Sequence, residues 1–162
     1  MKVLIAYRSK YGFTNRCAKM LAERINGEVE LAELKQRKPR TPASFDVVLV
    51  GGSIYGGAIQ REVPAFCNRQ REDLMRRPVG LFLCCLYEGE KARTQIQEAF
   101  PDWLLAHAFG SFHLGGGFEI DKLRFFDRFM AERVVGLNQS RSVINERAVD
   151  ELCERVNQLR RP

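Results

Sequence analysis

Apolar runs alternate with amphipathic stretches along most of the chain. The first run, Val3–Tyr7, is apolar and rich in branched residues, which predicts a buried parallel strand. Behind it, apolar residues recur at spacings of three and four, the pattern of one helix face. These residues are Cys17, Met20, Leu21 and Ile25. The chain therefore begins with a strand, a loop and a helix.

The same alternation continues and predicts five strands in all. Residues 28–34 alternate between apolar and charged side chains, so this strand is expected to have one solvent-exposed face and to lie at a sheet edge. The other predicted strands are 46–51, 79–86 and 106–114, and helices are expected in 61–76, in 91–100 and after the N-cap candidate Asn145. Repeated strand–helix units predict an α/β fold with a doubly wound parallel sheet and helices on both faces.

The loop Ser9–Asn15 carries the most specific chemistry of the N-terminal unit. It places two hydroxyls, Ser9 and Thr14, around Gly12 at the start of a helix. A helix N-terminus has unpaired N–H groups and a partial positive charge, and Gly12 allows a close approach of the backbone. Two readings are open here, a phosphate site and an ordinary strand-to-helix turn with a hydroxyl cap.

Two further loops follow buried strands. One is the glycine-rich stretch Ser53–Gly57, with Tyr55 at its centre, and the other is Leu86–Gly89, with Tyr87. In a parallel sheet with right-handed crossovers, all strand-to-helix loops meet at one edge, where ligands bind. The three loops together predict a pocket for a flat ring with a phosphate tail, although each tyrosine alone is as well explained by packing.

Phe118–Leu137 departs from the simple alternation. Its apolar residues, many of them aromatic, are spaced for one helix face, and basic residues are interleaved with them. One reading is a helix packed on the core, and the other is an amphipathic segment that meets a membrane surface or a large apolar substrate. Under the second reading, the candidate contact residues are Arg124, Phe125, Arg128 and Phe129.

Composition and charge narrow the class of protein to which the chain can belong. The chain has 162 residues, enough for one domain with a sizeable core, and no apolar run long enough to span a bilayer. We see no signal peptide and expect a cytoplasmic protein, with contact to the inner face of the cell membrane as an alternative. The five cysteines form no metal-like cluster, so we expect buried reduced thiols and no metal. The net charge of +6 suggests an anionic partner.

The chain resembles the flavodoxin family of FMN-binding proteins. The first strand with its hydroxyl–glycine loop is similar to that family's phosphate loop. The stretches Ser53–Gly56 and Leu83–Tyr87 resemble the two loops that flank the isoalloxazine ring. Within the family, Gly51–Gly56 and Phe126–Met130 look most like the branch of menaquinone-dependent protoporphyrinogen dehydrogenases. That branch has an extra segment after the last strand, which residues 118–142 would match here.

The resemblance implies a single flavodoxin-like domain with a five-stranded parallel sheet and non-covalent FMN. It implies phosphate contacts from Ser9, Lys10, Tyr11, Gly12, Phe13 and Thr14. It implies ring contacts from Ser53, Ile54, Tyr55, Gly56, Gly57, Leu86, Tyr87, Glu88 and Gly89. No catalytic side chain is implied, because the flavin carries the chemistry.

Two functions are weighed from this resemblance. The first is an FMN-dependent dehydrogenase of heme biosynthesis that passes electrons from a large apolar or anionic donor, a porphyrinogen, to a quinone. The second is a flavodoxin-type electron-transfer protein without an organic substrate of its own; such carriers are typically acidic, whereas this chain is basic. The basic residues are scattered, so we expect no nucleic-acid partner, while a homodimer stays open.

Overall fold

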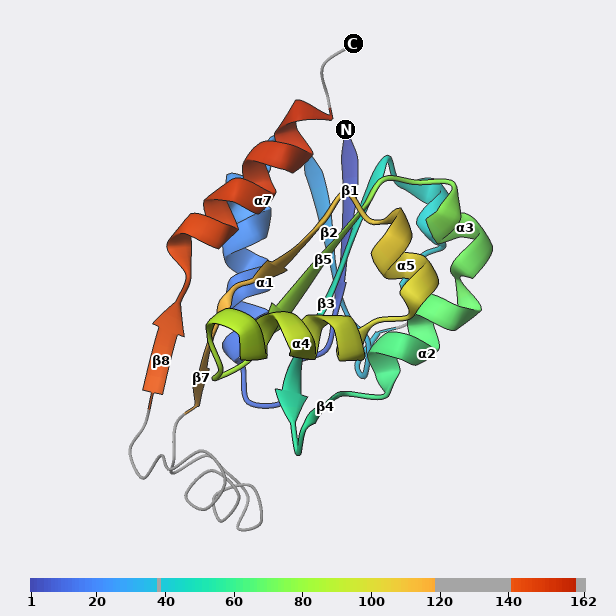
Figure 1. Ribbon diagram of the computed structural model, residues 1–162. Coiled ribbons are helices and arrows are strands. Elements are labelled where there is room, and N and C mark those ends of the chain that lie inside the picture. The colour runs from blue at the N-terminus through green and yellow to red at the C-terminus, as the bar shows by residue number, and fades with distance from the viewer. Residues whose placement is uncertain (38, 119–140, 160–162) are drawn as a thin grey trace.

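A parallel sheet in the strand order β2-β1-β3-β5-β6 forms the centre of the computed structural model, which describes residues 1–37, 39–118 and 141–159 (Figure 1). The strands are β1 (Lys2–Tyr7), β2 (Glu28–Glu33), β3 (Val47–Tyr55), β5 (Val79–Cys84) and β6 (Gly110–His113). The five-stranded sheet is confirmed, and β2 lies at its edge, as the alternating pattern predicted.

Helices cover both faces of this sheet. They are α1 (Phe13–Arg24), α2 (Glu62–Arg69), α3 (Arg71–Met75), α4 (Gly89–Ala99), α5 (Asp102–His107) and α7 (Glu146–Gln158), with a 3-10 turn η1 (Pro42–Ser44). Successive side chains of a strand point to opposite faces. Val3 and Ile5 therefore pack against α1 and α7, whereas Leu4 and Ala6 face α2 to α5.

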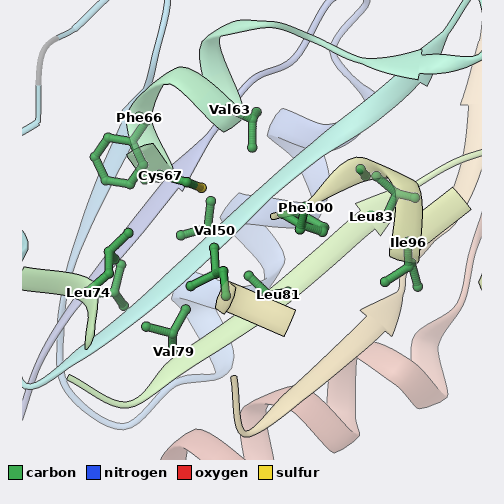
Figure 2. Packing of buried hydrophobic residues seen from close by; sticks show 14 of the residues in the cluster. Val50, Val63, Phe66, Cys67, Leu74, Val79, Leu81, Leu83, Ile96 and Phe100 are labelled. Atoms are coloured by element: carbon green, nitrogen blue, oxygen red, sulfur yellow. The ribbon is translucent and has the colours of Figure 1, made fainter. Parts of the chain in front are cut away.

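The larger of the two cores lies between the sheet and helices α2 to α5. Figure 2 shows Val50 and Leu81 of the sheet among side chains from the helices that cover them, such as Phe66 and Ile96. All four side chains are buried. The apolar runs of β3 and β5 are buried on both faces, which explains why the sequence shows no alternation there.

Three stretches differ from the sequence-based prediction. The single helix expected in 61–76 is divided into α2 and α3 at Gln70. The last strand, expected over 106–114, begins only at Gly110, because Asp102–His107 forms the short helix α5. Leu104 of α5 is fully buried, so an apolar pattern that we assigned to a connection and a strand belongs to a helix on the core.

A second, two-stranded sheet follows β6. Here β7 (Gly115–Phe118) pairs antiparallel with β8 (Arg141–Ile144), and we call this pair the β7–β8 ribbon. The sequence alone predicts only that the glycines of β7 close the last strand, and it is compatible with a loop or a short strand over 139–143. Asn145 then caps α7 as predicted, since its side-chain oxygen accepts the Ala148 N–H at 3.2 Å.

Among the described helices, none has both the length and the apolar composition needed to cross a bilayer.

The strand order reverses beside β1. The chain passes from β1 to β2 on one side, and β3 then pairs with β1 on the other, with Val3 opposite Val47. The loops that follow β1 and β3 therefore diverge from adjacent strand ends. Such a reversal point, at the carboxyl ends of the strands, is where open parallel sheets bind ligands.

Candidate functional site

The loop between β1 and α1 has an internal frame built on Ser9. The Ser9 Oγ accepts hydrogen bonds from the backbone N–H groups of Gly12 and Asn15, each at 3.2 Å. Gly12 has a φ of +93°, and nothing lies within 4 Å of the position where a Cβ would be. The backbone conformation, rather than a lack of space, therefore requires glycine here. We call residues 9–14 the phosphate loop.

Thr14 provides the test of whether a phosphate fits. Its side chain is buried in the first turn of α1 beside the Cys84 thiol, and its Oγ1 makes no hydrogen bond of normal geometry among the described residues. A buried hydroxyl without a partner is destabilising, so an unmade bond calls for a ligand or a water molecule. The first turn of α1 contains no acidic residue, and its N-terminus favours an anion. The residues present fit a phosphate group.

Aromatic side chains bring the phosphate loop into contact with the loop after β3. The rings of Tyr11 and Tyr55 meet edge to face, with their centroids 5.3 Å apart. The Lys10 ammonium lies over both rings, 5.2 Å from the Tyr11 centroid and 5.0 Å from the Tyr55 centroid. On the other side of the loop, the Arg16 guanidinium lies over the Phe13 ring at 5.3 Å. The structure thus brings together two of the three predicted loops.

The stretch Ser53–Gly57 is a hairpin rather than the open loop that we expected. Ser53, Ile54 and Tyr55 continue β3, which pairs antiparallel with the short strand β4 (Ala58–Ile59). Gly56 and Gly57 have φ values of +58° and +80°, as a two-residue hairpin turn requires. The glycines that suggested a flexible ligand loop form this tight turn, and we call residues 53–59 the hairpin.

A reciprocal pair of hydrogen bonds fixes the base of the hairpin. The Ser53 N–H donates to Gln60 Oε1 at 3.1 Å, and Gln60 Nε2 donates to Ser53 Oγ at 2.6 Å. Ser53 is buried, so its hydroxyl acts within the fold. Gln60 was not among the predicted site residues, because a partner seven residues away is not visible in a periodic pattern.

The third loop, Leu86–Gly89, follows β5 and packs against the β7–β8 ribbon. A Cβ at Gly116 would lie 2.2 Å from the Cys85 carbonyl oxygen, so only glycine allows this approach. The Cys85 N–H donates to the Gly115 carbonyl at 3.0 Å, and the His113 Nε2 donates to the Cys85 carbonyl at 3.0 Å. The Lys91 ammonium lies 5.3 Å from the centroid of the Tyr87 ring. We keep the name third loop for residues 86–89.

A pocket of about 290 Å³ lies where the third loop, the ribbon and the start of α7 meet. Its lining includes Leu86, Glu88, His113, Ile144 and Glu146. The four candidate contact residues Arg124, Phe125, Arg128 and Phe129 lie outside the described residues. The ribbon strands on either side of them are described, and Ser142 of β8 accepts a hydrogen bond from Arg16 of α1.

The thiols behave as structural groups. All five cysteines are free and buried, as the sequence predicted. Burial raises the pKa of the Cys84 thiol, with a further rise from the adjacent Cys17, and burial raises the pKa of Cys67 to about 12. A thiolate, the reactive form, is therefore disfavoured. Within the described part of the chain, no group of histidines, cysteines and carboxylates is suited to hold a metal ion.

The sequence pattern missed a charged network beneath the phosphate loop. Arg8, at the end of β1, forms ion pairs with Glu33 of β2 and Glu62 of α2, at 3.1 Å and 3.5 Å. Burial, followed by the negative charge of Glu33, raises the pKa of Tyr7, whose hydroxyl donates to Asn15 Oδ1 at 2.5 Å. Glu33 and Glu62 lie 25 and 54 residues after Arg8 in the sequence, so only the folded chain shows that they are partners.

A known protein family matches most of the chain. The model of the flavodoxin domain matches residues 4–142, which include all three loops. No curated protein matches the chain significantly.

Solved structures with the same fold cover most of the chain. A flavodoxin from Streptococcus pneumoniae aligns with a TM-score of 0.58 and 13% identity, over 98% of this chain and 99% of its own. A flavoprotein in complex with FMN from Lactobacillus acidophilus aligns with a TM-score of 0.53 and 17% identity, over 71% and 92%. The two-electron reduced flavodoxin of Megasphaera elsdenii aligns with a TM-score of 0.51 and 24% identity, over 70% of this chain and 82% of its own. At these identities the likeness establishes the fold.

Proposed function

Since the chain belongs to the flavodoxin domain family, we propose that it is an FMN-dependent oxidoreductase that passes electrons from a large apolar, anionic donor to a quinone. FMN is the cofactor of this fold, and when bound it supplies the electron and hydride chemistry. The donor that fits best is a porphyrinogen, as in the quinone-dependent oxidation of protoporphyrinogen IX in heme biosynthesis.

The residues of this chain serve to bind and orient the cofactor. Ser9 and Thr14 would hold the phosphate at the N-terminus of α1, where the helix dipole favours an anion. The hairpin and the third loop end at the same edge of the sheet and would flank the ring. Tyr55 already contacts the phosphate loop through Tyr11, so phosphate and ring sites are adjacent.

The observation that supports a substrate of its own is the position of the β7–β8 ribbon. The chain leaves the ribbon at Phe118 and returns at Arg141, and these two residues are paired. The ribbon packs on the Cys85–Leu86 backbone and reaches α1 through Ser142. The sequence between these two paired residues, 119–140, contains three arginines and three phenylalanines. Arginines there would attract the carboxylates of a porphyrinogen.

A variant that keeps the β7–β8 ribbon but lacks residues 119–140 tests this proposal. Because Phe118 and Arg141 are paired, replacing residues 119–140 by an Asn-Gly turn would close a regular hairpin. We expect the FMN-loaded native chain to oxidise protoporphyrinogen IX with a menaquinone analogue faster than free FMN, and the shortened variant to keep FMN but lose this activity. Native protein no faster than free FMN would refute the proposal.

The structural neighbours favour a second candidate, an electron carrier that docks on protein partners. The pneumococcal flavodoxin aligns over nearly the full length of both chains, although its fold alone does not establish a shared activity. Docking of such carriers depends on charge complementarity, and this chain has a net charge of +6, so its partner would be acidic. A reductive titration separates the two candidates, because a carrier shows two well-separated one-electron potentials and a dehydrogenase a single two-electron step.

A further inference from the structure

Charged side chains hold the backbone of Ser9 at both its N–H and its carbonyl group. Its N–H donates to Glu33 Oε1 at 3.2 Å, and its carbonyl accepts a hydrogen bond from Arg8 Nη1. The two side chains are themselves paired, with Arg8 Nη1 3.1 Å from Glu33 Oε1. We propose that Glu33 and Arg8 are positioning residues for the FMN phosphate, because they fix the backbone at the start of the phosphate loop before the ligand arrives. This inference requires FMN binding, but not the donor or the quinone proposed above.

The pair is nearly removed from water, which makes its placement informative. The side chains of Arg8 and Glu33 are only 12% and 11% exposed. A buried ion pair recovers little net stability, because desolvation offsets most of the attraction, but it restricts geometry strongly. The second oxygen of Glu33 is also used, since Oε2 accepts the Lys35 N–H at 3.2 Å and the Gln36 N–H at 3.0 Å. Glu33 therefore has one fixed position.

Arg8 also connects the phosphate loop with the ring side of the site. Its backbone N–H donates to the Gly51 carbonyl of β3 at 3.2 Å, and its Nε lies 3.5 Å from Glu62 Oε1. Glu62 begins α2, three residues after the hairpin ends. One arginine thus joins the ends of β1 and β2, the middle of β3 and the start of α2. A ligand that spans both loops benefits from such preorganisation, because less motion is lost on binding.

The direction in which FMN affinity changes when Glu33 is neutralised distinguishes a positioning role from a simple electrostatic one. Glu33 is a negative charge beneath a site for an anion. By Coulomb's law alone, neutralising Glu33 would strengthen the binding of FMN. If Glu33 acts by holding the Ser9 peptide, neutralising it weakens FMN binding instead. Riboflavin has the same ring but no phosphate, so its affinity reports the ring site alone.

The experiment measures the dissociation constants of FMN and riboflavin by quenching of flavin fluorescence, for the native apoprotein and for Glu33→Gln. Glutamine has the same shape but only one acceptor oxygen, so it cannot accept both the Ser9 N–H on one side and the Lys35 and Gln36 N–H groups on the other, and it forms no ion pair with Arg8. We expect FMN to bind about tenfold more weakly and riboflavin to change by less than about twofold, the loss of one positioning contact being on the order of 1.4 kcal/mol.

Glu30→Gln is the matched control. Glu30 lies on the same strand, is also 11% exposed and pairs with Arg37 and Arg40 instead of with residues of the phosphate loop. We expect it to leave both affinities within about twofold of native. An equal loss of FMN and riboflavin affinity in Glu33→Gln, or an equal effect of the two variants, would overturn the proposal.

The double variant Arg8→Gln/Glu33→Gln keeps the proposal falsifiable if the single variant unfolds. It removes both charges of the Arg8–Glu33 pair and leaves only the more exposed Glu62 without its arginine partner, and circular dichroism establishes folding before the titration. We expect it to lose FMN affinity by the same factor of about ten. The two side chains act as one unit, so removing the second adds nothing to the loss of the first. Tighter FMN binding in either folded variant would show that Glu33 acts through its charge and would overturn the proposal. No donor or quinone is present, so the result does not depend on the oxidoreductase assignment.

Discussion

The phosphate loop and the third loop lie at the same edge of the sheet but are held in different ways. Side chains hold the phosphate loop: the Ser9 hydroxyl inside it and the Arg8–Glu33 pair beneath it. The third loop rests on backbone packing, with Gly116 against Cys85. Because side chains fix the first loop around the proposed phosphate site, we expect substitutions there to discriminate FMN from riboflavin. Substitutions at the third loop should affect both flavins alike.

Thr14→Val should have the largest effect on the first loop. Valine replaces the buried hydroxyl by a methyl group of nearly equal size. A hydrogen bond to a charged phosphate contributes about 1.5–3 kcal/mol, so FMN should bind roughly 10- to 100-fold more weakly, with riboflavin unchanged. Fluorescence titration measures both constants.

The free protein should respond to Thr14→Val in the opposite direction. The Thr14 hydroxyl makes no hydrogen bond of normal geometry in the described structure, so its removal should leave the melting temperature of the apoprotein unchanged or slightly raised. A clear drop in melting temperature, or an equal loss of both flavins, would mean that Thr14 has a structural role.

Gly116→Ala should disturb the third loop next most strongly. The new methyl group would meet the Cys85 carbonyl oxygen at 2.2 Å, and backbone cannot move away as a flexible side chain can. Overpacking of this kind costs about 1–3 kcal/mol of unfolding free energy, and the ring site should weaken for FMN and riboflavin by the same factor. Urea unfolding and the same titration give both numbers.

Gly89→Ala is the control within that loop. Its φ of +58° is unfavourable for alanine, but nothing lies within 4 Å of the added carbon, so the cost should be about 1 kcal/mol at most. Should Gly116→Ala weaken FMN alone, the proposed division between the two loops would be wrong.

Alkaline pH should have the smallest effect, and it should act at the end of the sheet that carries the third loop. Burial raises the pKa of the Cys85 thiol from 9.0 to about 11. The folded chain therefore keeps a proton that the unfolded chain loses, so this contribution to stability is complete below pH 9 and declines as pH rises towards 11. Melting temperatures of native protein and Cys85→Ala between pH 7 and 10.5 measure it. The native curve should fall more steeply above pH 9, and parallel curves would contradict the assignment.

The sheet and the first loop at its carboxyl edge were predictable because burial leaves a clear pattern. The apolar run at β1, the alternation at β2 and the hydroxyls around Gly12 each follow from local chemistry. The hairpin was misread because Gly56 and Gly57 serve a tight turn as readily as a ligand loop. The ribbon was missed because the glycines of β7 have little strand propensity, and their pairing depends on β8, far along the chain.

The network around the phosphate loop was not predictable at all. Arg8, Glu33 and Glu62 are ordinary charged residues in the sequence, and nothing local marks them as partners. Their pairing depends on the parallel alignment of β1 with β2 and on the start of α2, which tertiary structure alone determines. Contacts between distant residues are therefore the part of the site that sequence reasoning does not reach.

The most direct test of the account is a titration of the apoprotein with FMN, followed by visible absorption and flavin fluorescence. The account predicts a shifted flavin spectrum, quenched fluorescence and saturation at one FMN per chain, with riboflavin at least about tenfold weaker because it lacks the phosphate. An FMN spectrum and fluorescence that stay unchanged in the presence of folded protein would contradict the assignment of the three loops to a flavin site.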